Sequence, residues 1–409
     1  MSNDLEWVSG GSVTTPRGFR AGAVAAGIKT LPAAELEARL DLGLLFADRP
    51  CSVAGIFTRN RVCGAPVTLC RERVRQGVAR ALIVNSGCSN VAMGERGLAD
   101  AHTMAALAAA RCGVPQEQVL VGSTGVIGRP LPMDKIEAGI ERIELSEAEG
   151  QAFARAIMTT DTVPKARALH VRIGQHRYSI GGVAKGSGMV HPDMATVFGF
   201  FTTDANLEPS VLSELLREAG DLSFNMIDVD MDTSTSDMML LFASGSAGGP
   251  PLAAGSQELR QFAAALNALA IELARDLARD GEGARTLIEM RVDGARTLED
   301  ARRAARTVVS SPLVKTMITG RDPNLGRVMM ALGRSGAELD VDRISVWIGE
   351  HCAFQRGAPT ALDHAAISRA MDAAEVQLRA DLGQGTYSAT AWGCDLTENY
   401  VRINADYTT

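Results

Sequence analysis

Runs of apolar residues divide this chain into short strands and amphipathic helices. Continuous or alternating apolar runs predict strands over residues 18–29, 40–57, 79–87, 168–173, 178–183, 197–201, 238–242, 287–292 and 344–350. Residues 119–131 are predicted to begin as a strand and to break into a glycine-rich turn from Gly122 onward. Apolar residues at helical spacing predict helices over 98–111, 146–158, 209–219, 256–280, 300–307, 326–332 and 362–378. Strands and helices mixed in this way predict an α/β (α+β) fold of layered sheets flanked by helices.

The sequence also predicts how one helix begins, how the chain ends and how it divides into domains. Ser146 and Glu149 have the spacing of a capping box at the start of a helix. The last residues, 397–409, alternate like a strand. A second, smaller α/β domain is predicted over 286–409, after a catalytic domain of residues 1–285. Since no Pro-, Gly- or Ser-rich linker separates the two, we expect them to pack together.

Composition narrows the class of protein. The chain has 409 residues, of which 46% are apolar and 22% charged, a globular profile that excludes a disordered chain. A net charge of −7 without a Lys/Arg cluster argues against a nucleic-acid partner. No apolar run reaches membrane-spanning length, and the first residues lack the pattern of a signal peptide. We therefore expect a cytoplasmic protein.

Cysteine and histidine usage gives no sign of a metal or a disulfide framework. The seven cysteines form no CxxC pair, and the six histidines lack ligand spacing. We expect free thiols, no metal and no cofactor. His191 lies five residues before Thr196, so an effect on cleavage at that residue is one interpretation and a simple loop role is the alternative.

The segment from Lys185 to Asp204 changes character halfway. Two glycines and a proline give its first half the pattern of a loop, whereas Val197 to Phe201 reads as a buried strand. Thr196 stands at the junction behind small Ala195. Its hydroxyl can attack the Ala195 carbonyl, move the acyl group from nitrogen to oxygen, and release a chain whose new α-amine serves as a base. The alternative is an ordinary β-branched residue that opens a strand.

Other polar positions follow predicted elements. Glycines 122, 125 and 128 form a turn after a strand, which suits a structural role, a phosphate or an oxyanion, although the P-loop lysine is absent. A hydroxyl cluster begins at Thr159, and Glu282 stands between two glycines after a long helix. From the residues alone, these positions are equally consistent with capping and solvated turns.

Several blocks together resemble the ornithine acetyltransferase family of arginine biosynthesis. They occur in the family's order and extend over nearly the whole chain: TTPRGFRAGAVAAGIK, VNSGCSN, VGSTGVIG, IMTTDTVPK, KGSGMVHPDMATVFGFFTTDA, DMDTSTSD, RDGEGA, GRDPNLGR and CDLTENYVRIN. The resemblance implies an ornithine acetyltransferase-like fold, similar to that of self-processing aminopeptidases.

This resemblance also implies an activity and a set of site residues. The family moves an acetyl group from N-acetylornithine to glutamate by a ping-pong mechanism, after cleavage between Ala195 and Thr196. The implied nucleophile is Thr196, and the oxyanion is held by the Thr124 hydroxyl and the Gly125 amide. The residues implied in substrate binding are Thr159, Lys185, Thr196, Glu282, Asn404 and Thr409. No cofactor is implied, although acetyl-CoA is a conceivable second donor, and the two fragments are expected to assemble as α2β2.

The chain departs from the family pattern at a few positions. Cys88 and Ser89 replace the usual residues of one block, Leu325 replaces a tryptophan, and Met231 replaces a glycine. The lysine that usually ends the block EGATK is lost, and Arg285 lies one place before its position. These changes leave open a paralogue that acts on another amino acid. Two other classes also remain open: a self-processed amide hydrolase, and an uncleaved binding protein without catalysis.

Overall fold

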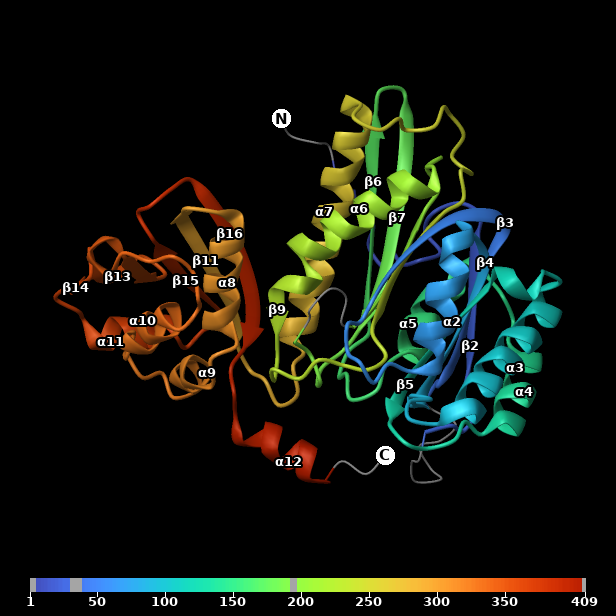
Figure 1. Ribbon diagram of the computed structural model, residues 1–409, viewed down its shortest axis with the longest axis horizontal. Helices are drawn as coiled ribbons and strands as arrows, with labels where there is room; N and C mark the ends of the chain where they lie inside the picture. The colour runs from blue at the N-terminus through green and yellow to red at the C-terminus, as the bar shows by residue number, and fades with distance from the viewer. Residues whose placement is uncertain (1–4, 30–38, 192–196, 407–409) are drawn as a thin grey trace.

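The computed structural model describes residues 5–29, 39–191 and 197–406. Two β-sheets flanked by helices make up the molecule, one on each side of Figure 1. The predicted α/β class with layered sheets is therefore confirmed.

The larger sheet runs through the first two thirds of the chain. Its strands, in spatial order, are β1 (Leu5–Trp7), β6 (Lys165–Ile173), β7 (His176–Lys185), β8 (Phe198–Thr203), β10 (Met238–Ala243), β3 (Leu42–Phe57), β4 (Val78–Cys88) and β5 (Val119–Val126), and β2 (Phe19–Val24) pairs with β3. Strand β8 is antiparallel to β7 and parallel to β10, whereas β4 and β5 are parallel. The strand that follows the predicted cleavage junction is therefore held between two neighbours.

Helices α6 (Pro209–Leu222) and α7 (Gln257–Arg279) cover one outer side of this sheet, and α3 (Gly94–Cys112) and α4 (Met133–Arg142) cover the other (Figure 1). Helices α2 (Ala65–Arg73) and α5 (Gly150–Ala156) contribute Val67 and Phe153 to a third core. Helices α6 and α7 pack in one core with Phe201 and Leu241, while α3 and α4 pack in another with Leu44 and Ile83. Alternate residues of each strand thus face different cores.

The sheet folds back on itself along its longest strand. The pairing of β3 with β4 shifts between Phe46 and Cys51, a bulge that lets the strand bend. Phe198 and Phe200 then pack with Leu82 in an apolar core between the two halves. Strand β5 crosses β8 so closely that a Cβ added at Gly122 would lie 3.5 Å from the Phe198 ring. This crossing brings the end of β5 to the predicted active region.

The smaller sheet belongs mainly to the last third of the chain. In spatial order its strands are β14 (Ala358–Pro359), β13 (His351–Gln355), β12 (Ser345–Ile348), β15 (Glu375–Asp381), β11 (Leu287–Ala295), β16 (Tyr387–Cys394) and β9 (Ile227–Asp228). Its helices are α8 (Leu298–Val309), α9 (Pro312–Thr319), α10 (Gly326–Gly333), α11 (His364–Ala370) and α12 (Glu398–Asp406). Because β9 comes from before residue 285, the two sheets are joined by more than one crossing of the chain. The domain boundary at 285/286 stays a prediction.

Short 3-10 helices complete the elements. They are Val74–Gln76, Gln116–Gln118, Glu147–Glu149, Phe224–Met226 and Val341–Arg343.

Most predicted elements are confirmed, but several local predictions are wrong. The helix predicted over 362–378 stops at Ala370, and residues Glu375–Asp381 form a strand whose alternate residues are buried. The expected strand at the C-terminus is helix α12 instead. The capping box at Ser146 does not form, because the Ser146 N–H donates to the Ala21 carbonyl at 2.8 Å and is unavailable to Glu149.

Candidate functional site

A cavity of about 150 Å³ lies where β5 and β7 end and where β8 and β10 begin. Among the residues that line it are six of those predicted from the sequence: Thr124, Gly125, Thr159, Lys185, Glu282 and Asn404. Val190 and Val197, on either side of the predicted cleavage junction, line it too. Ala195, Thr196 and Thr409 lie outside the described residues.

Strand β5 delivers the two predicted oxyanion donors. Thr124 and Gly125 pair with Ser86 and Gly87 of β4, so they belong to the strand rather than to the turn that the sequence predicts there. Gly125 has a φ of +125°, and an added Cβ would lie 2.4 Å from the carbonyl carbon of Gly87. Only glycine fits at this position.

Lys185, at the end of β7, contacts the Thr124 side chain. Its Nζ donates to the Thr124 hydroxyl oxygen at 3.1 Å. Because that oxygen accepts from the ammonium, its own proton is able to point at a ligand in the cavity. The lysine therefore both orients the hydroxyl and places a positive charge at the cavity wall.

A buried ion network fixes the segments around Thr159 and Lys185. The Asp161 carboxylate accepts from the amides of Thr159 and Gly186, at 3.0 and 2.8 Å, and from Lys165 Nζ at 2.6 Å. Burial opposes ionisation of Asp161, but the nearby charges of Lys165 and Lys185 outweigh it and lower the pKa of this carboxyl below its usual range. Two loops are thus attached to one carboxylate.

The same network reaches the loop that carries Glu282. Lys165 Nζ also donates to Asp280 at 2.6 Å, at the end of α7. The Glu282 amide then donates to the Ser187 carbonyl at 2.8 Å. Gly188 leaves room for the carboxylate, since an added Cβ would lie 2.4 Å from its carboxyl carbon. The acidic group is therefore held against the glycine-rich loop.

Helix α12 completes the cavity from the far end of the chain. Asn404 Nδ2 donates to the Glu282 carboxylate at 2.7 Å and to the Tyr400 carbonyl at 3.1 Å. The helical tail, not a strand, is what brings Asn404 to the site.

Asp237 is a cavity residue to which the sequence gave no role. Its side chain is only 5% exposed, and within the described part of the chain its Oδ2 has no hydrogen-bond partner. Burial raises the pKa of Asp237 to about 7, against the opposing effects of a hydrogen bond from Ser234 and the charge of Lys185. In the sequence, the position of Asp237 at the end of the polar cluster 230–237, directly before a predicted buried strand, is the feature that could have indicated a buried carboxyl.

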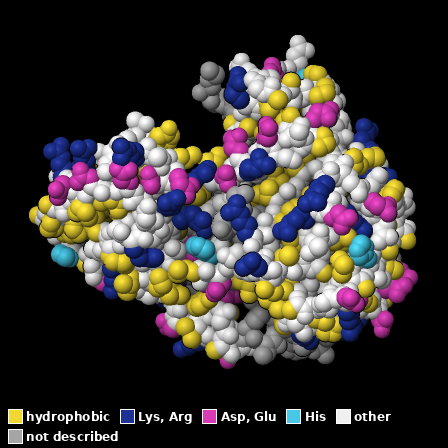
Figure 2. Space-filling view, in the orientation of Figure 1, with side chains coloured by type: hydrophobic (Ala, Val, Ile, Leu, Met, Phe, Trp, Pro, Cys, Tyr) yellow, Lys and Arg dark blue, Asp and Glu magenta, His cyan; other side chains and the backbone are white. Residues whose placement is uncertain are grey.

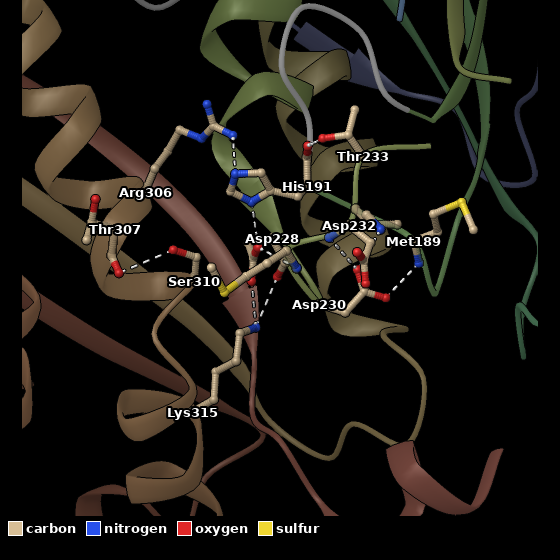
Figure 3. A network of polar contacts seen from close by, with 12 residues as sticks. Met189, His191, Asp228, Asp230, Asp232, Thr233, Arg306, Thr307, Ser310 and Lys315 are labelled. Carbon is tan, nitrogen blue, oxygen red and sulfur yellow. Dashed lines mark hydrogen bonds and ion pairs between the residues drawn. The ribbon is translucent and has the colours of Figure 1, made fainter. Parts of the chain in front are cut away.

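The wall that leads to the junction is held by polar side chains (Figure 3). Asp230 accepts from the amides of Met189 and Val190, at 2.6 and 3.0 Å. The Thr233 hydroxyl donates to the His191 carbonyl at 3.0 Å. These contacts fix the chain up to residue 191.

The His191 ring takes part in a second network (Figure 3). Its Nδ1 lies 2.8 Å from the Asp228 carboxylate, and its Nε2 lies 3.3 Å from Arg306 Nη2. Asp228 also pairs with buried Lys315 at 3.1 Å. Donation from Nδ1 to Asp228 and acceptance at Nε2 from Arg306 satisfy both neighbours. The histidine is thus part of the wall rather than an isolated loop residue.

Neither a metal cluster nor a disulfide is found among the described residues. No group of three or more His, Cys, Asp or Glu there has the arrangement of a metal site, and all seven cysteines are free. Within the described ranges no helix is long and apolar enough to cross a membrane.

Comparisons with known proteins show the family of the chain. The profile of the ArgJ family matches residues 20–409. The arginine biosynthesis bifunctional protein ArgJ of Symbiobacterium thermophilum is 51% identical over 407 residues, which cover 99% of this chain and 100% of the relative. The protein of the same name from Dehalococcoides mccartyi is 46% identical over the full length of both chains.

A solved structure is similar as well. The crystal structure of arginine biosynthesis bifunctional protein ArgJ from Bacillus halodurans is 39% identical, with a TM-score of 0.50. The match extends over 98% of the Bacillus halodurans chain and over 51% of the chain described here. From the profile match and the full-length relatives it follows that this chain belongs to the ArgJ family.

Proposed function

We propose that this chain cleaves itself between Ala195 and Thr196 and then uses Thr196 to carry an acetyl group from N-acetylornithine to glutamate. The chain is an acyltransferase in this proposal, and the full-length relatives are named as bifunctional proteins of arginine biosynthesis. The observation that carries the proposal is the cavity itself. Residues from five separate segments converge beside Val190 and Val197, the residues of the cavity lining that are nearest in sequence to the junction.

The cavity offers the groups that acyl transfer requires. In the proposed reaction, Thr196 Oγ attacks the acetyl carbonyl, and the new α-amine of Thr196 takes the proton. The Thr124 hydroxyl and the Gly125 amide stabilise the tetrahedral oxyanion, and the loss of one such donor typically costs about 3 kcal/mol in transition-state stabilisation. Lys185, 3.1 Å from the Thr124 hydroxyl, adds positive charge where the negative charge develops.

Substrate recognition follows from two opposite charges at the cavity wall. Lys185 suits the carboxylate that ornithine and glutamate share, while Glu282 suits an ammonium group. Thr159, Asn404 and Thr409 complete the proposed binding set. Since both amino acids carry a carboxylate and an amine, one cavity serves donor and acceptor in turn.

The length of the solved relative supports cleavage. Its chain corresponds to 51% of this one, close to the share of either fragment that a cut at 195/196 produces. Assembly of the two fragments as α2β2, a cytoplasmic location and use of acetyl-CoA as a second donor are further parts of the proposal.

Mass spectrometry tests the proposal. Purified protein should consist of fragments 1–195 and 196–409, and Thr196→Ala should remain one chain. Incubation with N-acetylornithine alone should place one acetyl group on fragment 196–409, and glutamate should remove it as N-acetylglutamate. Release of acetate with no dependence on glutamate would instead identify an amide hydrolase.

The control variant is Ser310→Ala, which changes a hydroxyl outside the cavity. It should be cleaved and acetylated like the parent protein. If Thr196→Ala is also cleaved, the proposal is wrong.

A further inference from the structure

Self-cleavage and acyl transfer differ in the base that is available to them. The proposed acyl transfer uses the α-amine of Thr196, which does not exist until the peptide bond between Ala195 and Thr196 is cut. Before the cut, this nitrogen belongs to an amide, whose lone pair is delocalised and is not basic. Another group must therefore take the hydroxyl proton when Thr196 attacks the Ala195 carbonyl.

Among the described residues that line the cavity, three carry titratable side chains: Lys185, Asp237 and Glu282. Lys185 donates to the Thr124 hydroxyl at 3.1 Å, and an ammonium group has no acceptor for a proton. Glu282 accepts from Asn404 Nδ2 at 2.7 Å and lies in the loop after α7, not beside the strand that follows the junction. Asp237 is left as the titratable residue to which the proposed acyl transfer gives no role.

Strand pairing places Asp237 beside the first described residue after the junction. Met238 of β10 pairs in parallel with Phe198 of β8, and the Met238 amide donates to the Val197 carbonyl at 3.1 Å. On the other side, the Thr58 amide donates to the Asp237 carbonyl at 3.0 Å. Asp237 and Val197 thus precede the first paired residues of two neighbouring strands, and both line the cavity. Adjacent strands lie about 4.8 Å apart, a separation that an aspartate side chain can bridge.

The Asp237 carboxyl has the free oxygen that a base needs. On the face of the molecule in Figure 2, Asp and Glu side chains lie beside Lys and Arg side chains at several places. Asp237 differs from these surface carboxylates, because it is 5% exposed and its Oδ2 has no hydrogen-bond partner within the described ranges. Ser234 hydrogen-bonds to this carboxyl, and the charge of Lys185 acts on it. A buried polar atom without a partner weakens a fold, so its retention indicates a functional group.

We propose that Asp237 is the proton acceptor in self-cleavage. Its carboxylate takes the hydroxyl proton of Thr196 as Oγ forms a bond to the carbonyl carbon of Ala195. The same proton then passes to the Thr196 nitrogen as the bond between this nitrogen and the carbonyl carbon breaks. The acyl group has moved from nitrogen to oxygen, Asp237 is ionised again, and water hydrolyses the ester to release the carboxyl group of Ala195. The inference rests on the proposed cleavage and names the group that performs its proton transfers.

The acidity of Asp237 suits this role. Burial raises the pKa of its carboxyl to about 7, against the opposing effects of the Ser234 hydrogen bond and the Lys185 charge. A carboxylate with this pKa is a stronger base than an ordinary aspartate, and it is still ionised in part at neutral pH. Because cleavage needs the ionised form, its rate should rise about tenfold for each pH unit below about 7 and should be constant above that pH.

Cell-free synthesis of the full chain tests the inference on the parent protein. Synthesis is stopped after a short pulse, and the uncleaved chain is transferred to buffers between about pH 5 and pH 8. Electrophoresis then follows the appearance of fragments 1–195 and 196–409. The cleavage rate should rise with pH and level off near pH 7, as the ionisation of Asp237 requires. A rate that does not change with pH across this range would overturn the inference.

Asp237→Asn tests the role of the carboxyl itself. The substitution keeps the shape of the side chain, but an amide does not accept the proton. Cleavage at about pH 8 should therefore slow at least about 100-fold, and the rise with pH should be lost. Urea denaturation of the same variant in the Thr196→Ala background checks that the fold is retained. The control is Asp232→Asn, an exposed carboxyl of the same polar cluster outside the cavity, which should be cleaved at the parent rate.

The outcomes separate this inference from the proposed function. A parent chain that is never cleaved refutes the proposed function. If the parent is cleaved and Asp237→Asn is cleaved at a similar rate, only the role of Asp237 is refuted. Slow cleavage of Asp237→Asn together with a parent rate that does not depend on pH would show a structural role, which also overturns the inference.

Discussion

Asp237 leads to a quantitative prediction about stability and pH. Burial raises the pKa of its carboxyl from 3.8 to about 7 in the folded protein. The unfolded chain releases this proton near pH 4, whereas the folded protein keeps it until near pH 7. The contribution of Asp237 to stability is therefore largest below about pH 4, falls as pH rises to about 7, and is constant above that.

The size of this loss follows from the two pKa values. At 1.36 kcal/mol for each pH unit between them, the free energy of unfolding should fall by roughly 4 kcal/mol across the interval. Asp237→Asn keeps the shape of the side chain but cannot ionise. After about 1 kcal/mol is allowed for altered hydrogen bonding, the variant should be more stable than the parent by roughly 3 kcal/mol at pH 8.

Urea denaturation between about pH 5 and pH 8 measures this difference. The Thr196→Ala background is suitable, because a single chain unfolds without dissociation of fragments. Asp342→Asn, which changes an exposed carboxyl, is the control and should leave the pH dependence unaltered. The reasoning is refuted if the advantage of Asp237→Asn does not grow between pH 5 and pH 7, or if the variant is less stable at pH 8.

Two further predictions concern backbone strain and steric room. Met231 has a φ of +67° and is 47% exposed, so Met231→Gly should relieve backbone strain and raise the free energy of unfolding by roughly 1 kcal/mol. Met231→Ala keeps the strained backbone and should not raise it. Equal effects of the two substitutions would exclude strain as the cause. Gly188→Ala would place a Cβ 2.4 Å from the Glu282 carboxyl carbon, so the KM for N-acetylornithine should rise at least about tenfold. Gly333→Ala, with nothing within 4 Å of the added Cβ, is its control, and an unchanged KM for Gly188→Ala would contradict the placement of Glu282.

The strands and helices were predictable where one apolar pattern extended over a whole element. The strand Met238–Ala243 and the long helix that ends at Arg279 are examples. The prediction failed where two elements share one apolar run. Residues 371–374 turn the chain between α11 and β15, and they contain neither glycine nor proline to indicate the break.

The site was predictable only in part, for a geometric reason. Lys185 and Glu282 could be selected from the sequence because each lies beside glycines in a segment that resembles a family block. Their approach to Thr124 depends on the crossing of β5 over β8, which no local pattern encodes. Asp237 was missed since a carboxylate in a polar cluster normally indicates solvent, and only the fold shows that it is buried.

The central claim is that one peptide bond is cut to create the nucleophile. Intact mass spectrometry of the purified protein, before and after N-acetylornithine, tests it most directly. The account predicts two fragments that meet at residues 195 and 196, with one acetyl group on the fragment that begins at Thr196. A single full-length chain of 43.2 kDa, or fragments that never acquire an acetyl group, would contradict it.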